Sequence, residues 1–188
     1  MAAIIFLIFL LLVVVVTILV LALVFISGIV SDKYGVSFVP TRRRNIKKLF
    51  VWAGLSADDI FYDLGCGDGR VLICAVKDFG VMEAVGYEVA PWPYIKARFL
   101  IWLFGVKDRT SVLRRDFLKD DLSSATFIYT YLSHKLVEKL AIKLAVELKP
   151  GTRILCHTFP IDLGHHPEFK LIKSEEFDKI TAYLYKRI

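Results

Sequence analysis

The chain has 188 residues and a formal net charge of +6, and 56% of its residues are hydrophobic. Its three cysteines are scattered without metal-ligand spacing, which argues against a zinc-bound or disulfide-stapled scaffold and indicates a reducing compartment. Half of the charge excess lies within residues 31–60, which hold six basic and three acidic residues, so the remainder lacks the basic balance of a nucleic-acid-binding domain.

The segment from Ala2 to Val30 contains no charged residue and is rich in Ile, Leu, Val and Phe. The hydrocarbon core of a bilayer is about 30 Å thick and needs roughly 20 apolar helical residues, so this segment is long enough to span it. A cleaved signal peptide would begin with basic residues and have a shorter apolar stretch of roughly 7–15 residues. We therefore predict a retained transmembrane anchor over residues 1–30.

Basic residues follow the apolar segment, and only the terminal amine precedes it. Because Lys and Arg are retained on the inner side of a membrane, the N-terminus is expected outside and the soluble remainder on the cytoplasmic or matrix side. Membrane lipid is then an expected partner of the basic flank. The basic residues are Lys33, Arg42, Arg43, Arg44, Lys47 and Lys48.

Residues 31–59 are predicted to form a linker, with Gly and Pro in 33–41, and then a basic amphipathic helix. Thr41 is a suitable N-cap and Gly54 a suitable C-terminal stop. The basic face of this helix suits either lipid head groups or plain solvent. Its apolar face is expected to hold Ile46, Leu49, Phe50 and Ala53 at helical spacing.

Strand-like and helix-like segments alternate through residues 60–188. Such alternation is typical of an α/β domain with a parallel sheet and helices on both faces, which binds its ligand outside the carboxyl ends of the strands. The predicted strands are 60–64, 82–89, 110–116, 125–132 and 152–159, the helices are 69–78, 93–105 and 134–151, and a closing antiparallel pair is 168–174 with 180–188.

The loop after the first predicted strand reads Gly65-Cys66-Gly67-Asp68-Gly69-Arg70. Glycines allow a tight turn and a close approach of ligand to backbone. Arg70 replaces the last glycine of the dinucleotide pattern G-x-G-x-x-G, and Asp68 would repel a pyrophosphate, so a neutral or cationic nucleoside is expected in place of NAD. Glu88 ends the second strand, where an acid can hold ribose hydroxyls. The alternative is a plain Gly-rich turn.

"DLGCGDGR" (63–70) followed by "GYE" (86–88) resembles motif I and the next acid of class I S-adenosylmethionine-dependent methyltransferases. The resemblance implies a Rossmann-like seven-stranded sheet and S-adenosylmethionine as cofactor. It also implies that the glycine loop passes under the methionine part, that Asp63 lies near the amino group, and that Glu88 takes the ribose. Asp116, in "RRDF", matches the acid that meets adenine, or is a turn-starting Asp. The implied cofactor residues are Asp63, Gly65, Gly67, Asp68, Gly69, Glu88 and Asp116.

"SFVPT" (37–41) and "GYEVAPW" (86–92) add a resemblance to the membrane-anchored protein-lysine methyltransferases of mitochondria and their prokaryotic relatives. Those enzymes modify the ATP synthase c-subunit or the adenine nucleotide translocase, which implies a lysine of a membrane protein as acceptor. Ala90 departs from the Asn that these relatives usually carry. A lipid, quinone or other small-molecule acceptor is the alternative, and a non-catalytic binding module is a third hypothesis.

A lysine acceptor must lose a proton from an amine of pKa about 10.4, and a dry aromatic channel favours that loss. Candidate channel residues at the ends of the fourth and fifth strands are Tyr131, His157 and Phe159, each equally suited to packing, and no general base is assigned. His165 and His166 make a poor metal site, so no metal is expected. After strand four stands "YTYL" (129–132), without the Pro-Pro-aromatic signature of amino-purine methylation, so a nucleic-acid substrate is not expected.

Overall fold

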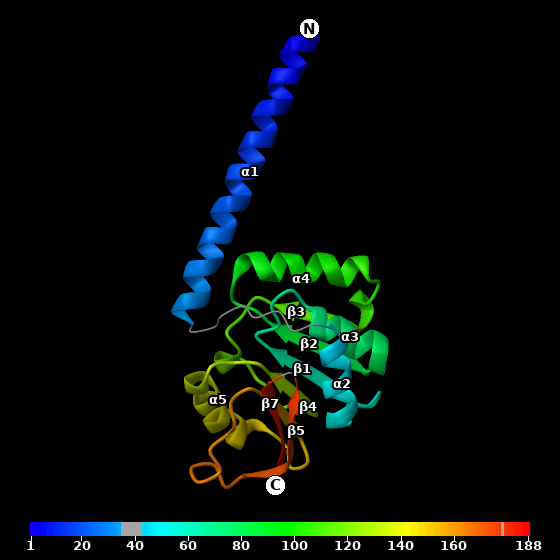
Figure 1. The fold of residues 1–188 in the computed structure, drawn as a ribbon, viewed down its shortest axis with the longest axis vertical. Coiled ribbons are helices and arrows are strands. Elements are labelled where there is room, and N and C mark those ends of the chain that lie inside the picture. Colours follow the sequence, from blue (N-terminus) through cyan, green and yellow to red (C-terminus); the bar gives the residue numbers. More distant parts are fainter. Residues whose placement is uncertain (35–42, 178) are drawn as a thin grey trace.

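The computed structural model describes residues 1–34, 43–177 and 179–188. The chain begins with one long helix, α1 (Ala2–Lys33), which projects from a compact α/β domain (Figure 1). The helix continues three residues beyond the predicted end of the anchor. By length and composition it can cross a membrane, and none of its most apolar stretch is buried. The predicted linker, the Thr41 cap and "SFVPT" lie almost wholly outside the described residues.

Seven strands form one sheet in the order β3-β2-β1-β4-β5-β7-β6, as the resemblance implies. The first five strands are parallel, and β7 runs antiparallel to both β5 and β6. The predicted second to fifth strands each extend two or three residues too far, because their last residues leave the sheet to form loops at its carboxyl edge. The strands are β1 (Ile60–Leu64), β2 (Glu83–Tyr87), β3 (Thr110–Leu113), β4 (Phe127–Thr130), β5 (Arg153–His157), β6 (Phe169–Phe177) and β7 (Ile180–Arg187).

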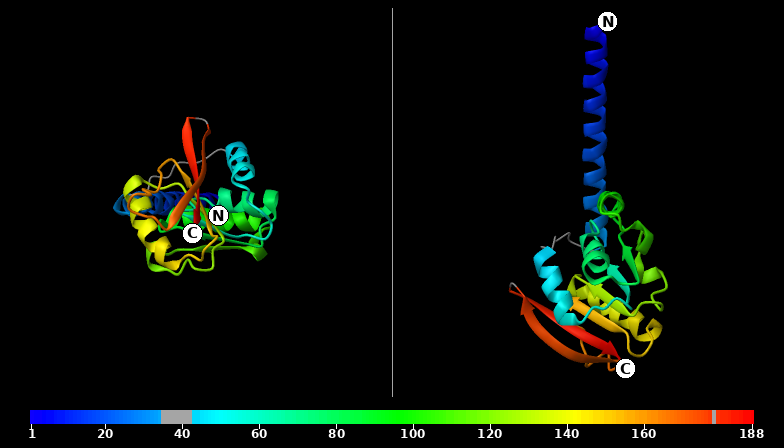
Figure 2. Two further views of the ribbon diagram at one scale, coloured as in Figure 1. Left: turned by 90° about the horizontal axis from the view of Figure 1, so that it is seen from below. Right: turned by 90° about the vertical axis from the view of Figure 1, so that its right-hand side faces the viewer.

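Helices cover both faces of this sheet (Figures 1 and 2). Alternation along β1 sends Phe61 into one core with α2 and α3, and Tyr62 and Leu64 into a second core with α5. The helices are α2 (Arg43–Ala53), α3 (Arg70–Phe79), α4 (Pro91–Leu103) and α5 (His134–Glu147), with short 3₁₀ turns η1 (Lys107–Arg109) and η2 (Phe117–Lys119). No residue of α1 belongs to either core, so the core of the domain is complete without that helix.

The α2 helix buries the predicted apolar stripe of Ile46, Leu49, Phe50 and Ala53. It stops at Gly54, which adopts a positive φ of 72°. Part of its basic face also pairs with protein: Arg43 and Lys47, both still exposed, lie 3.0 and 2.9 Å from the carboxylate of Asp78 in α3. Arg44 and Lys48 remain exposed, and lipid contact by these two side chains stays a prediction.

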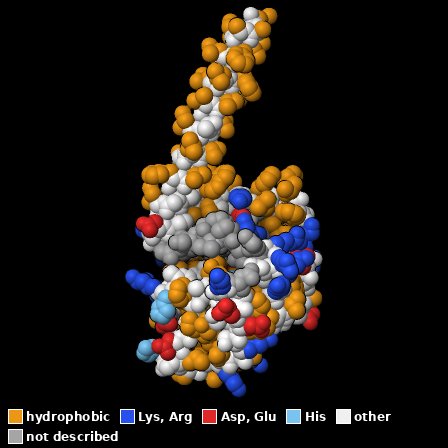
Figure 3. Space-filling model, in the orientation of Figure 1, with side chains coloured by type: hydrophobic (Ala, Val, Ile, Leu, Met, Phe, Trp, Pro, Cys, Tyr) orange, Lys and Arg blue, Asp and Glu red, His pale blue; other side chains and the backbone are white. Residues whose placement is uncertain are grey.

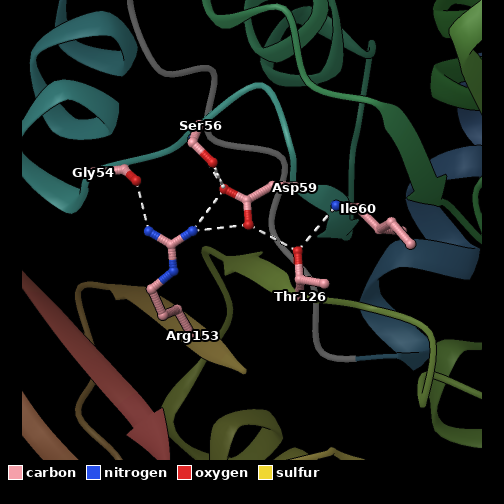
Figure 4. Close-up of polar contacts among 6 residues, drawn as sticks. All are labelled: Gly54, Ser56, Asp59, Ile60, Thr126 and Arg153. Carbon is pink, nitrogen blue, oxygen red and sulfur yellow. Dashed lines mark hydrogen bonds and ion pairs between the residues drawn. The ribbon is translucent and has the colours of Figure 1, made fainter. Parts of the chain in front are cut away.

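An ion pair between the buried Asp59 and the half-buried Arg153 joins the start of β1 to the start of β5 (Figure 4). Arg153 donates to both carboxylate oxygens of Asp59 at 2.8 and 2.6 Å and to the carbonyl of Gly54 at 2.6 Å. Ser56 and Thr126 complete the shell of donors around the carboxylate. Burial alone would raise the pKa of Asp59, but the bonds from Ser56, Thr126 and Arg153 outweigh it and lower the pKa.

Replacing Arg153 by Met should cost about 3–5 kcal/mol of unfolding free energy, because it leaves the Asp59 carboxylate buried without its cation. Urea unfolding of the full chain in detergent measures this loss. The Asp59 pKa is lowered in the folded state, so its contribution is present above the unfolded pKa of about 3.9 and is lost as the pH falls through the folded value. The free energy of unfolding of Arg153→Met should therefore also decrease less steeply than that of the unchanged protein as the pH is lowered through the acid range.

The matched control is Arg115→Met, which removes an exposed ion pair with Asp120. That change should stay within about 1 kcal/mol. Equal losses from the two variants would mean that the pair of Asp59 and Arg153 does not organise the strand starts.

Candidate active site

The glycine loop lies where the chain order of the sheet reverses. From β1 the chain goes to β2 and β3 on one side, and later to β4 and β5 on the other. Such a switch point opens a crevice at the carboxyl ends of the strands. The backbone N–H groups of Gly65 and Cys66 both donate to the carbonyl of Tyr87 at 2.9 Å, which ties the loop to β2. The predicted location of the ligand site thus coincides with the switch point of the sheet.

The loop conformation requires glycine at three positions. Gly65, Gly67 and Gly69 have positive φ values of 88°, 55° and 76°, a region that side chains rarely adopt. At Gly69 a Cβ would also lie 3.1 Å from Cβ of Ala97 in α4. Gly69 therefore lets the start of α3 pack directly on α4.

Glu88 links the glycine loop to the beginning of α4. Its two carboxylate oxygens accept hydrogen bonds from the backbone N–H of Gly67 at 3.0 Å and of Ala90 at 2.8 Å. Burial raises its pKa, and these backbone bonds act in the opposite direction. The residue that departs from the family pattern, Ala90, thus contributes its backbone to Glu88, and a backbone contact does not depend on the side chain.

Asp63 is buried, and within the described residues its Oδ2 atom has no hydrogen-bond partner. Burial, followed by the charges of Glu88 and Asp68, raises its pKa well above the usual range. Buried polar atoms are almost always paired in folded proteins. The unpaired oxygen of Asp63 is therefore the kind of group that a cationic ligand would complete.

Asp68 is not the isolated charge that the sequence suggested. Arg70 donates to its two oxygens at 2.8 and 2.6 Å, and Nζ of Lys96 from α4 lies 3.1 Å away. Burial alone would raise the pKa of Asp68, but these two cations lower it. The expected repulsion of a pyrophosphate by a bare Asp68 is thus offset in the structure. Lys96 was not identified from the sequence, because nothing local links it to the loop.

Asp116 was predicted at the end of the third strand; it stands in the loop three residues after Leu113, the last residue of β3, and is half-buried. One of its oxygens accepts a hydrogen bond from the N–H of Leu118 at 3.0 Å and caps the 3₁₀ turn η2. The turn-starting role weighed from the sequence is therefore present. A contact with adenine remains a prediction for this residue.

The structure brings together two of the three predicted channel residues. The rings of Tyr131 and His157 are 4.6 Å apart at 30°. Nδ1 of the buried His157 lies 3.0 Å from the hydroxyl of Tyr129, and burial lowers the pKa of His157 to about 4, so the imidazole is neutral. Phe159 lies apart, partly exposed, with its ring 6.0 Å from that of His134.

Sequence reasoning missed Tyr129. The signal was present: Tyr129 and Tyr131 are two residues apart, so alternation along an extended chain places them on one face. Within the described ranges, no group of three or more His, Cys, Asp or Glu side chains could hold a metal ion. His165 contacts Asp162 and His166 contacts Glu138, so the two histidines turn to different partners.

A family model described as the ANTKMT methyltransferase domain matches residues 63–170, from within β1 to the beginning of β6. The chain belongs to this methyltransferase family. A protein-lysine N-methyltransferase of Saccharolobus islandicus (strain REY15A) is 42% identical over 151 residues, which cover 80% of this chain and 92% of the relative. The ATP synthase c-subunit lysine N-methyltransferase of Xenopus laevis is 30% identical over 128 residues, which cover 68% of this chain and 55% of that protein.

Among solved structures, an RNA methyltransferase from Salinibacter ruber in complex with S-adenosyl-L-homocysteine is 31% identical to this chain. Its TM-score is 0.72, and the alignment covers 79% of this chain and 94% of that one. The chain is thus an ANTKMT-type enzyme of the S-adenosylmethionine-dependent protein-lysine methyltransferases. The predicted fold, enzyme class and cofactor are confirmed.

The crevice fits this cofactor on its own geometry. The methionine end of S-adenosylmethionine carries an ammonium, which matches the unpaired buried oxygen of Asp63. The three left-handed glycines allow the tight turn by which the loop backbone can come close to a ligand. Glu88 stands at the end of the neighbouring strand, where an acid can receive ribose hydroxyls.

Replacing Glu88 by Ala should weaken the binding of S-adenosylhomocysteine by about 1.5–3 kcal/mol, the worth of charge-assisted hydrogen bonds. The change also leaves the N–H groups of Gly67 and Ala90 without their acceptor. Titration calorimetry on the detergent-solubilised full chain measures the affinity. The control is Glu83→Ala at the opposite, exposed end of β2, which should bind normally. Equal affinities would remove Glu88 from the cofactor site.

Proposed function

We propose that this methyltransferase is anchored in a membrane by α1 and transfers methyl groups to lysine side chains of a membrane protein. The observation that carries the proposal is α1 itself, a 32-residue helix long and apolar enough to span a bilayer. It stands outside the core of an enzyme whose fold is complete without it. The Xenopus relative is named for a component of ATP synthase, which supports an acceptor in a membrane assembly.

The orientation follows from the charges beside α1. The basic residues after the helix favour the inner side, so the N-terminus lies outside and the catalytic domain faces the cytoplasm or matrix. The described basic residues of this flank are Lys33, Arg43, Arg44, Lys47 and Lys48.

Methyl transfer requires mainly that the acceptor amine is neutral and that it is aligned with the methyl group. The bound cofactor supplies an activated methyl group on a sulfonium, and the protein must hold the acceptor nitrogen in line with it. Tyr131 and the neutral His157 are proposed to form one wall of the acceptor channel. Removal from water against aromatic rings, where no carboxylate pairs with the ammonium, disfavours the charged form of lysine and favours the neutral amine. Phe159 is proposed to lie at the outer rim.

Asp63 is proposed to receive the ammonium of the cofactor. In the free protein its raised pKa keeps a proton on the carboxyl at pH values where an exposed aspartate, with a pKa of about 3.9, has lost it. A cation beside a carboxylate lowers its pKa. At pH values between the lower pKa of Asp63 in the complex and its raised pKa in the free protein, binding should therefore release a proton. The affinity for the ligand should increase as the pH rises through this range.

Calorimetry of S-adenosylhomocysteine binding in buffers of different ionisation enthalpy measures this proton release. Asp63→Asn should abolish the release, while the control Glu83→Gln, at the opposite and exposed end of β2, should retain it. An unchanged release from Asp63→Asn would assign the proton to a different group.

The acceptor itself should be found by comparing the full chain with a chain that begins at Ser31. Both should bind cofactor and methylate detergent-solubilised acceptor, since the cores contain no α1 residue. In native membranes the shorter chain should be much slower, because anchoring raises the effective concentration of membrane-bound acceptors without any new contact. Mass spectrometry of membranes incubated with labelled cofactor locates the methyl group.

Two other acceptors are outcomes of the same measurement. Label on lipid or quinone and on no lysine would replace the protein acceptor with a small molecule. Label on RNA would place the chain with the Salinibacter enzyme in substrate as well as in fold. As a control on orientation, protease added outside intact cells or right-side-out vesicles should leave the domain uncut.

A further inference from the structure

One face of α4 is apolar and exposed. Phe99 and Trp102 have 55% and 63% of their surface accessible, and Ile95 and Leu103 lie beside them at helical spacing. The opposite face buries Ala97 and Ile101 against the domain. Figure 3 shows hydrophobic side chains gathered along the upper edge of the domain, over α4. The helix is therefore apolar on both sides, although the domain covers only one of them.

The position of α4 relative to α1 is fixed by a direct contact. The N–H of Trp92 donates to Oγ of Ser27 at 2.8 Å, and that hydroxyl donates to the carbonyl of Leu23 at 2.8 Å. Leu23, Ser27, Val30 and Ser31 are the less exposed positions near the end of α1 and share one helical face. Both views place α4 across the base of α1, on the side of the domain from which α1 projects (Figures 1 and 2).

The length of α1 sets the depth of α4. Residues 2–22 are exposed all round, and at 1.5 Å per residue they extend about 32 Å, close to the roughly 30 Å of a hydrocarbon core. Ser27 lies about 7.5 Å farther along the helix. A helix with its side chains has a radius of about 5–6 Å, so side chains of α4 directed toward the membrane come within a few ångströms of the hydrocarbon edge.

The composition of α4 and its flanks matches that depth. Residues 89–107 contain three basic and no acidic residues, together with Trp92, Tyr94 and Trp102. Tryptophan and tyrosine favour the head-group level of a bilayer, and interfacial helices combine an apolar face with basic residues that attract anionic lipids. The chemistry points to a lipid surface and not to another protein chain.

We propose that α4 is a second membrane contact, lying in the interface plane with Ile95, Phe99, Trp102 and Leu103 at the hydrocarbon edge. The inference rests on the proposed anchoring by α1. It has a consequence for catalysis, because α4 also supports the cofactor loop through Lys96, Ala97 and the bond of Ala90 to Glu88. The active site is thereby held one helix below the membrane surface, which selects acceptor lysines at that level.

The test uses the full chain in vesicles of phosphatidylcholine and phosphatidylglycerol, with one nitrobenzoxadiazole probe attached to an introduced cysteine. The native cysteines are buried, so the introduced thiol is labelled preferentially. Three variants are compared: Phe99→Cys on α4, Val16→Cys within α1, and Val146→Cys on α5, where the native side chain is 85% exposed. Lipids brominated at shallow or deep positions quench probes at the corresponding depth.

The expected result is a blue-shifted emission at position 99 with quenching by shallow bromine, quenching at position 16 by deep bromine, and neither at position 146. A probe at 99 that behaves like that at 146, while 16 is quenched, overturns the contact by α4 and leaves the anchor standing. Loss of quenching at 16 removes the anchor itself. A blue shift at 99 in detergent that grows with protein concentration assigns the face to a second copy of the chain and also overturns the proposal.

Discussion

Three buried carboxylates, Asp63, Asp68 and Glu88, lie in or beside the glycine loop. The cost of burying each charge is offset in a different way. For Glu88 the offset comes from backbone N–H groups, and for Asp68 from Arg70 and Lys96. Asp63 keeps an unpaired oxygen. Isolated buried charges cost several kcal/mol, so the loop, the start of α3 and the start of α4 must stay close to supply the partners. The same electrostatic constraint leaves one acceptor free for a cationic ligand.

The α4 helix is the element through which this constraint reaches the rest of the molecule. The N–H of its N-cap residue Ala90 donates to Glu88, Lys96 forms an ion pair with Asp68, and Ala97 packs against Gly69. Its N–H at Trp92 binds Ser27 of the long apolar helix. A displacement of α4 would therefore disturb the cofactor loop and the contact with α1 together. Cofactor binding and the proposed membrane contact would therefore share α4 as a structural support.

The opposite end of the sheet is organised by a separate pair. Asp59 and Arg153 join the starts of β1 and β5, far along the strands from the crevice (Figure 4). Nη2 of Arg153 binds both oxygens of Asp59 and Nη1 binds the carbonyl of Gly54, and such charge-assisted hydrogen bonds are stronger than neutral ones. The pair helps to fix the parallel register that places Tyr131 and His157 side by side at the carboxyl edge. The site thus depends on a strand alignment that is stabilised at the other end of the sheet.

Local patterns in the sequence determined the apolar span, the alternation of strands and helices, the left-handed glycines and the position of Glu88, because each depends on neighbours within a few residues. Tertiary structure alone decided which buried acid has a charged partner and which has none, since Lys96 reaches Asp68 only after α4 packs on Gly69. It also decided the pairing of Tyr129 with His157 across adjacent strands and the separation of Phe159 from both. The exposed face of α4 was also decided by tertiary structure: the sequence predicts a helix over 93–105, and only packing shows which of its apolar sides the domain leaves uncovered.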